Sequence, residues 1–302
     1  MCGIVGFLDK THNAHAAVGS MLCEMLQALG CRGPDSAGVA LYGSGQAGEL
    51  VLQIKLGEGG DCERKSQEIV ARAQHLGTLR DRSRTAEYLR LVLSDADDPL
   101  QVERLIEADD DHVEVVSMGR HLEIVKQVGS PQSLDATYGV SKRTGTHGLG
   151  HTRLSTESRI DLSHSQPFWA HGYPDLAIVH NGHITNYDTM RRRYEQRGVR
   201  FYTHNDSEII GVYLAERLSR GSTLGEALQA SLTDFDGSFS YLAATPQALG
   251  FAKDPFALKP LLCAETETFV AVATEEMAIR AACEGTYTVR EAQAREVRVW
   301  QR

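Results

Sequence analysis

The sequence predicts an α+β fold in which stacked β-sheets are covered by helices. Apolar runs of strand length recur along the chain, and amphipathic stretches with helical spacing lie between them. The 302 residues, 42% of them hydrophobic and 24% charged, suffice to bury a large core. No internal repeat or low-complexity tract interrupts the pattern, so we expect one globular arrangement of these elements.

The first third of the chain is expected to begin with strands and then turn helical. We expect a strand at 4–8, a helix at 16–29, a Gly/Pro turn at 31–36, and strands at 38–42 and 50–56 joined by a Gly-rich hairpin turn. Apolar residues at helical spacing over 63–77, 85–93 and 99–108 then predict a helical insert at about 57–111.

The remainder is expected to be richer in strands. Strands are predicted at 113–116, 122–125 (where a helix is the alternative), 148–153, 176–180, 238–245, 249–253, 261–264, 269–273 and within 286–300. Helices are predicted at 206–220, capped by Asn205 or Asp206, and at 223–233 and 275–282.

Composition excludes several function classes. The net charge is −9 and the longest basic run, Arg191-Arg192-Arg193, is expected on an exposed helix face, so nucleic acid is not an expected partner. No apolar run is long enough to cross a membrane. The six cysteines form no C-x-x-C pair, and the chain has no H-E-x-x-H pattern and no G-x-G-x-x-G nucleotide loop between a strand and a helix. We expect a cytoplasmic protein with no metal or cofactor in this chain.

Cys2 is the residue with the strongest chemical signal. After removal of Met1 it would carry a thiol and a free α-amine, and a terminal amine can take the proton of a side-chain nucleophile. The alternative is a small apolar residue at the start of a buried strand. Four further segments favour the chemical interpretation: Arg32-Gly33-Pro34-Asp35-Ser36, Gly150-His151-Thr152-Arg153-Leu154-Ser155-Thr156, Val179-His180-Asn181-Gly182-His183-Ile184-Thr185-Asn186, and Asn205-Asp206-Ser207-Glu208.

In this order, these segments and Cys2-Gly3-Ile4-Val5-Gly6 resemble the class II, or N-terminal nucleophile, glutamine amidotransferases. The resemblance covers almost the whole chain, and the insert matches least specifically. It implies a four-layer αββα sandwich of two antiparallel sheets of the N-terminal nucleophile hydrolase type, forming a single domain over residues 1–302. Residues 253–261 and 274–276 also resemble family segments, which we expect to lie outside the glutaminase chemistry.

The resemblance assigns a role to each motif. Cys2 would attack the side-chain amide of L-glutamine, and Asn181 and Gly182 would form the oxyanion hole. Arg153, helped by Thr156, would bind the α-carboxylate, and Asp206 would bind the α-ammonium group. Arg32 would support the site without taking part in the chemistry. For Asn181-Gly182 a tight hairpin turn is the alternative, and for Asp206 a helix cap.

The chain resembles the glutamate-synthase branch of the family more than its phosphoribosyl or sugar branches. That branch includes the stand-alone amidotransferase subunit of N-methylglutamate synthase (methylamine–glutamate N-methyltransferase). This implies that the chain passes ammonia to synthase subunits of a heteromeric complex, and that those partners carry FMN and an iron–sulfur cluster. Two alternatives remain: a non-catalytic scaffold or glutamine/glutamate-binding subunit, if Met1 is retained, and a hydrolase of another amide, which the Arg153/Asp206 pair disfavours.

Overall fold

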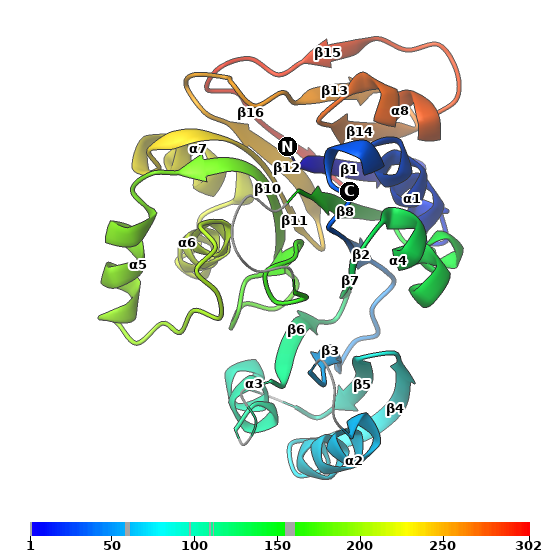
Figure 1. Cartoon of the computed structure of the whole chain (residues 1–302), viewed down its shortest axis with the longest axis vertical. Coiled ribbons are helices and arrows are strands. Elements are labelled where there is room, and N and C mark those ends of the chain that lie inside the picture. Colours follow the sequence, from blue (N-terminus) through cyan, green and yellow to red (C-terminus); the bar gives the residue numbers. More distant parts are fainter. Residues whose placement is uncertain (1, 58–60, 97, 109, 111, 155–160) are drawn as a thin grey trace.

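In a computed structural model the chain forms a sandwich of two antiparallel sheets with helices on both outer faces (Figure 1). The structure describes residues 2–57, 61–96, 98–108, 110, 112–154 and 161–302. The four-layer αββα arrangement is therefore confirmed. Among these residues, no helix combines the length and the apolar character needed to cross a bilayer.

The first sheet has seven strands in the order β15-β13-β14-β1-β8-β2-β7. These are β15 (Val289–Glu291), β13 (Leu262–Glu265), β14 (Phe269–Ala273), β1 (Gly3–Asp9), β8 (His147–Arg153), β2 (Ser36–Tyr42) and β7 (Leu122–Val128). Its outer face is covered by α1 (Val18–Ala28), α4 (Pro131–Tyr138) and α8 (Glu276–Ala282). The N-terminal strand thus lies in the middle of the sheet, where both of its edges are paired.

The second sheet has the order β16-β12-β11-β10-β9. Its strands are β16 (Val297–Gln301), β12 (Ala248–Lys253), β11 (Gly237–Thr245), β10 (Ala177–Ile184) and β9 (Phe168–Trp169). Helices α6 (Ser207–Ser219) and α7 (Leu224–Asp234) cover it, and α5 (Tyr187–Glu195) packs beside α6. A capping box of Thr223 and Glu226 fixes the start of α7.

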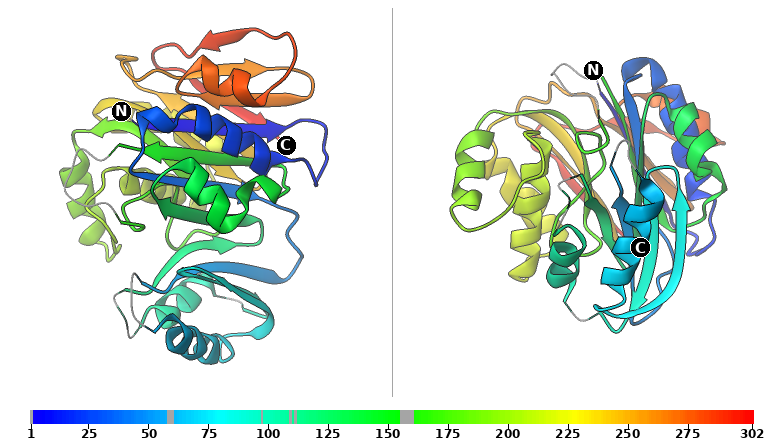
Figure 2. Two further views of the ribbon diagram at one scale, coloured as in Figure 1. Left: turned by 45° about the vertical axis from the view of Figure 1, so that its right-hand side comes forward. Right: turned by 60° about the horizontal axis from the view of Figure 1, so that its bottom comes forward.

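The insert contains a third sheet, so the prediction of a helical insert at 57–111 is wrong in part. Helices α2 (Cys62–Ala73) and α3 (Pro99–Ile106) are present, but β4 (Thr78–Thr85) and β5 (Tyr88–Ser94) lie between them. They join β3 (Glu49–Lys55) and β6 (Glu114–Gly119) in the order β4-β5-β3-β6. This unit projects from one end of the sandwich (Figure 2).

The predicted helix at 85–93 is a strand for a tertiary reason. Ala86 adopts a left-handed φ of 50° in a tight turn, which reverses the chain from β4 into β5. β5 then pairs on both edges, with β3 and β4, and its side chains are mostly buried. Sheet packing of this kind overrides the helical spacing of Ala86, Leu89, Val92 and Leu93. The hairpin predicted between residues 42 and 50 is also wrong, because β2 and β3 belong to different sheets.

One helix was not predicted. α4 begins after Ser130, whose hydroxyl accepts the N–H of Ser133, and ends at Gly139, which has a φ of 59°. Ser-Pro at the start and Gly at the end are the sequence signals that could have revealed it.

Candidate active site

Cys2 lies at the end of the central strand of the first sheet. Gly3 pairs with Thr152 of β8, and the N–H of Ile4 donates to Thr274 Oγ1 at 2.8 Å. The half-buried Sγ of Cys2 lies 3.9 Å from the carbonyl oxygen of Leu154. Both neighbouring strands therefore hold the backbone that carries Cys2, so the residue is fixed by its sheet pairing.

Asn181 reaches the same point from the second sheet. Its Nδ2 donates to the carbonyl oxygen of Cys2 at 3.3 Å, although 179 positions separate the two residues. Asn181 is 4% exposed and pairs with Ser240 of β11. The two sheets thus meet where the sequence predicted a nucleophile and an oxyanion donor.

The Asn181-Gly182 dipeptide is part of a strand, so the hairpin-turn alternative is wrong. Gly182 pairs with Phe239 inside β10, which continues to Ile184. The φ of Gly182 is 143°, and a Cβ here would lie 2.2 Å from the carbonyl oxygen of Ser238. Only glycine fits this conformation and this close approach.

Arg32 also contacts the backbone of Cys2. Its Nε lies 3.4 Å from the carbonyl oxygen of Cys2, and its guanidinium pairs with Glu275. The adjacent Gly33 lies against β8, since a Cβ there would be 2.5 Å from the backbone N of Arg153. These contacts suit a residue that positions Cys2. Thr274 and Glu275 also contact the residues around Cys2, through Ile4 and Arg32, although no part in the chemistry was predicted for this segment.

Arg153 is the last residue of β8 and pairs with Ser36 of β2. Because Thr152 pairs with Gly3, Arg153 follows directly beside the strand end that carries Cys2. Its side chain is half-buried at the rim of the sheet. Thr156, the second residue predicted to bind the carboxylate, lies outside the described residues.

Asp206 stands at the N-cap position of α6, but its side chain makes no cap hydrogen bond and instead supports the end of β10. Its Oδ2 accepts the N–H of Ile184 at 2.7 Å and lies 3.4 Å from His183 Nδ1. The cap of α6 comes from Asn205, whose side-chain oxygen accepts the N–H of Ser207. A carboxylate is therefore held two residues beyond Gly182 along the same strand, and one of the two predicted caps, Asn205, is confirmed.

Two buried histidines lie between the sheets behind this site. Burial, together with the charge of Arg153, lowers the pKa of His151 to about 3, and burial also lowers the pKa of His180. His180 Nδ1 lies 2.8 Å from Ser207 Oγ, and the Gln166 side chain accepts the N–H of His180. Both imidazoles are neutral near pH 7, so they do not supply a cationic acid there. Sequence reasoning missed Gln166, for which no local pattern gives a signal.

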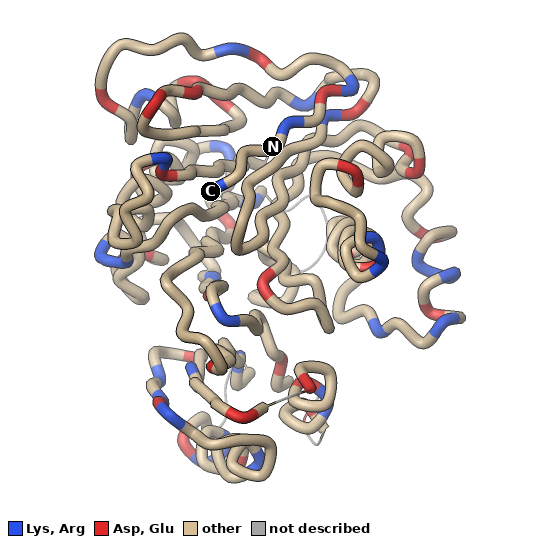
Figure 3. Tube along the Cα trace, turned by 180° about the vertical axis from the view of Figure 1, so that it is seen from behind, with Lys and Arg blue, Asp and Glu red and all other residues tan. Residues whose placement is uncertain are grey.

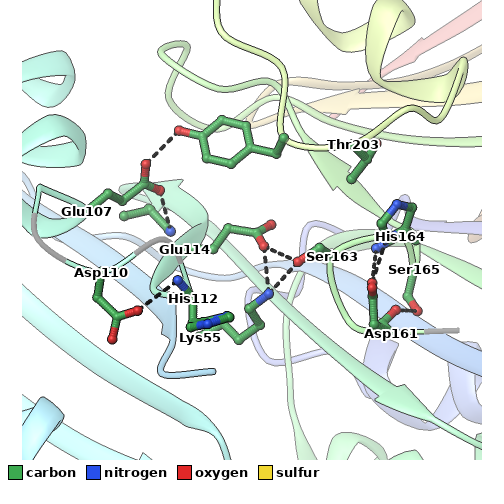
Figure 4. Close-up of polar contacts among 12 residues, drawn as sticks. Lys55, Glu107, Asp110, His112, Glu114, Asp161, Ser163, His164, Ser165 and Thr203 are labelled. Atoms are coloured by element: carbon green, nitrogen blue, oxygen red, sulfur yellow. Dashed lines mark hydrogen bonds and ion pairs between the residues drawn. The ribbon is translucent and has the colours of Figure 1, made fainter. Parts of the chain in front are cut away.

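A second polar cluster joins the insert to the sandwich (Figure 4). Lys55 pairs with Glu114 at 3.0 Å, and Ser163 donates to the same Glu114 oxygen at 2.5 Å. Lys126 and Lys55 outweigh burial and lower the pKa of Glu114 to about 2, whereas burial lowers that of Lys126 to about 8. These buried charged side chains form an ionic network that links β3, β6 and β7.

Within the described ranges, Glu103, Glu107 and His171 are the residues whose spacing could hold a metal ion, with ligand atoms within 4.8 Å of one another. Their atoms already bond to protein groups. His171 Nδ1 lies 2.7 Å from Glu103, and the Tyr202 hydroxyl lies 2.8 Å from Glu103 and 2.7 Å from Glu107. These hydrogen bonds link α3 to the sandwich and already use the side-chain atoms that could bind a metal ion.

Known proteins resemble this chain along its full length. It is 37% identical to a putative glutamine amidotransferase of Methanothermobacter thermautotrophicus, over 100% of both chains. The chain belongs to the glutamine amidotransferases. It is also 34% identical to the glutamine amidotransferase-like protein GlxB of Rhizobium meliloti, over 92% of this chain and 91% of that one. Residues 151–281 match the glutamine amidotransferase domain family.

Solved structures support the fold of this amidotransferase. The glutamine phosphoribosylpyrophosphate amidotransferase of B. subtilis has a TM-score of 0.63 at 19% identity, covering 99% of this chain and 47% of that one. A structure described as the allosteric regulatory enzyme of purine biosynthesis has a TM-score of 0.64 at 20% identity, again over 99% of this chain and 46% of that one. The chain thus spans about half of these neighbours, which share the N-terminal nucleophile hydrolase fold.

Proposed function

We propose that this amidotransferase hydrolyses L-glutamine with Cys2 as its N-terminal nucleophile. The observation that supports this most directly is the contact between Asn181 Nδ2 and the Cys2 carbonyl oxygen, which brings an amide donor from one sheet to the strand end of the other. Met1 must be removed first, because the α-amine of Cys2 then serves as the proton acceptor and donor. No histidine is needed as a base, in keeping with the lowered pKa values of the buried His151 and His180, which make both imidazoles weak proton acceptors.

In the first step the Cys2 thiolate attacks the amide carbon of glutamine. The N–H of Gly182 and the Asn181 side chain stabilise the developing oxyanion. The C–N bond then breaks, ammonia leaves with a proton delivered by the Cys2 α-ammonium group, and a thioester remains. A water molecule attacks the thioester, giving glutamate and restoring the thiol.

The substrate's α-groups are recognised away from the reacting amide. Arg153 and Thr156 bind the α-carboxylate, since a guanidinium presents two parallel N–H groups to a carboxylate. Asp206 binds the α-ammonium group from the end of β10, where it is anchored by Ile184. Arg32 holds the backbone of Cys2 without touching substrate.

The ammonia passes to a partner synthase subunit in a heteromeric complex of the glutamate-synthase-like or N-methylglutamate synthase type. Chemistry supports direct delivery, because free ammonia near neutral pH is mostly protonated and then no longer nucleophilic. FMN and an iron–sulfur cluster belong to those partner subunits in this proposal. Co-purification of the untagged chain with a tagged synthase subunit tests the assignment, and failure to co-purify with any such subunit contradicts it.

Intact-protein mass measured before and after 6-diazo-5-oxo-norleucine, a reactive glutamine analogue, tests the nucleophile. We expect a mass lacking Met1, followed by one adduct that the Cys2→Ser variant does not form. Cys31 is exposed and provides the matched control, because the Cys31→Ser variant should label as the parent does.

The second candidate function is a non-catalytic scaffold or glutamine/glutamate-binding subunit. It is favoured if the mature chain keeps Met1, since the α-amine is then absent from Cys2. Retained Met1 and no adduct, with partner subunits added, would establish this alternative. Binding of glutamate without hydrolysis of glutamine would then be its signature.

A further inference from the structure

A pocket of about 690 Å³ lies between α5, α6 and the end of α7, on the outer side of the second sheet. Four arginines line it: Arg193, Arg197, Arg217 and Arg220. Three carboxylates, Glu216, Asp234 and Asp236, lie among them, so the pocket has an excess of positive charge on a chain whose net charge is −9. Figure 3 shows both basic and acidic positions on α5, at the right edge of that view.

The carboxylates and two tyrosines hold three of these guanidinium groups in place. Arg197 and Arg220 (2.6 Å) both donate to the same oxygen of Glu216, whose other oxygen accepts the Tyr194 hydroxyl at 2.9 Å. The charge of one carboxylate is thus shared by two arginines. The Arg197 hydrogen bond, with help from Tyr194, lowers the pKa of Glu216, so it is ionised at neutral pH.

A second set of contacts orients Arg217. It donates to Asp234 at 2.7 Å, and the Tyr213 hydroxyl donates to the same oxygen at 2.6 Å. The planes of Arg197 and Arg217 lie over the rings of Tyr194 and Tyr213, at 5.3 and 4.8 Å from the ring centroids. Stacking fixes a guanidinium while leaving its N–H edge available.

Most donors in the pocket remain available to a ligand. Each guanidinium has five N–H donors, and Arg197, Arg217 and Arg220 each use one in the contacts above. The side chain of Arg193 is exposed and makes no hydrogen bond or ion pair with any residue that the structure describes. The side chains of Arg197 and Arg220 are 53% and 70% exposed, so solvent and solutes reach them.

We infer that this pocket binds an anionic ligand bearing a phosphate or pyrophosphate group. Several pre-oriented guanidinium groups around one concave site match the geometry of phosphate oxygens, and charge-assisted hydrogen bonds are the strong ones. The volume falls within the range of small-molecule sites. The inference concerns a site distinct from Cys2 and holds whether or not Cys2 is catalytic.

Isothermal titration calorimetry of the full chain at low salt tests the site, with inorganic pyrophosphate, orthophosphate and succinate as separate probes. We expect saturable one-site binding of pyrophosphate, tighter than that of orthophosphate and weakened by added salt. The Arg193→Gln variant should bind about tenfold more weakly, and Arg193→Gln/Arg197→Gln weaker still. Arg193→Gln removes no side-chain hydrogen bond or ion pair among the residues that the structure describes, so it should unfold at the same temperature as the parent.

Arg280 provides a matched control on the other side of the sandwich. It pairs with Glu276 at 3.1 Å and lies 4.4 Å from the ring centroid of Tyr287, as the pocket arginines do with their partners. The Arg280→Gln variant should bind pyrophosphate as the parent does. The inference is overturned by the absence of saturable binding, by equal weakening in Arg280→Gln, by unchanged affinity in the double variant, or by succinate binding as tightly as pyrophosphate.

Discussion

Replacing Asn181 separates the proposed catalytic role of its side chain from its structural role. The amide makes one described hydrogen bond, a donation of 3.3 Å to the Cys2 carbonyl oxygen. A neutral hydrogen bond of this kind contributes about 0.5–1.5 kcal/mol to stability. An oxyanion-hole donor contributes more to the reaction, since its loss costs about 2.7–4 kcal/mol, or roughly 100- to 1000-fold in kcat.

The Asn181→Ala variant should therefore lose far more activity than stability. We expect kcat for glutamine hydrolysis to fall by about 100- to 1000-fold with little change in KM, while the free energy of unfolding falls by about 1 kcal/mol. Asn181→Asp keeps the size of the side chain but cannot donate when ionised, so its kcat should be at least as low. Coupled glutamate detection measures kcat, and urea unfolding measures stability.

Asn186 supplies the matched control. It follows the end of β10 and bonds through its own side chain to the backbone of Asp234 and Asp236, away from Cys2. Asn186→Ala should lose a similar amount of stability and keep kcat within a few-fold of the parent. If folded Asn181→Ala retains kcat within tenfold of the parent, Asn181 is not the oxyanion donor and its role is to hold the strand end.

Variants at four other positions, Arg153, Gly182, Glu114 and His151, also have defined expected outcomes. Arg153→Lys should raise KM for glutamine at least about tenfold with a smaller change in kcat, because an ammonium group cannot reproduce the two parallel donors of a guanidinium. If the variant and the parent have equal KM values, Arg153 does not bind the substrate. Gly182→Ala should lower the free energy of unfolding by more than about 1–3 kcal/mol in urea unfolding, since φ is 143° and the added Cβ would collide with the carbonyl oxygen of Ser238. An unchanged midpoint of unfolding would show that the backbone of β11 shifts to make room at little cost. Glu114→Gln should lower the free energy of unfolding by about 3–5 kcal/mol, because Lys55 and Lys126 stay buried without a counter-charge. The double variant Lys55→Met/Glu114→Leu should lose less stability than the sum of its single variants. Additive losses of stability would refute coupling between these residues. The pKa of His151 in the folded state, about 3, lies below its ordinary value of 6.5, so only the unfolded chain binds a proton at this residue between these pH values. The free energy of unfolding should therefore fall as the pH drops from about 6.5 toward 3. His151→Asn should reduce the slope of the free energy of unfolding against pH by up to about 1.4 kcal/mol per pH unit, and an unchanged slope would show that His151 is not the group responsible.

The sequence predicted the elements that have strong local signals. The buried strand at 4–8, the helix at 16–29 and the helix at 223–233 are all present, because their apolar spacing and caps act within a few residues. It also predicted that Cys2, Arg32, Arg153 and Asn181 share one site, and the structure brings these four together at the adjoining ends of β1, β8 and β10. Their chemical roles stay predictions until the variants above are measured.

Local patterns failed where partners distant in sequence decide the outcome. Four apolar residues of 85–93 have helical spacing, namely Ala86, Leu89, Val92 and Leu93. The segment nevertheless forms a strand because β3 and β4 pair with its two edges. Asn205 and Asp206 were equivalent as caps in the sequence. The structure assigns the cap to Asn205 and frees Asp206 to hold Ile184, a distinction that depends on where β10 ends.

By itself, the sequence determined which reactive groups this protein has and the order in which they occur, since the nature and spacing of side chains are properties of the chain. Only the tertiary structure decided what Asn181-Gly182 forms. A glycine with positive φ suits both a hairpin turn and a close approach of backbones, and the local sequence cannot separate the two. Pairing with Ser240 and Phe239, more than fifty residues away, settles it as a strand that ends beside Cys2.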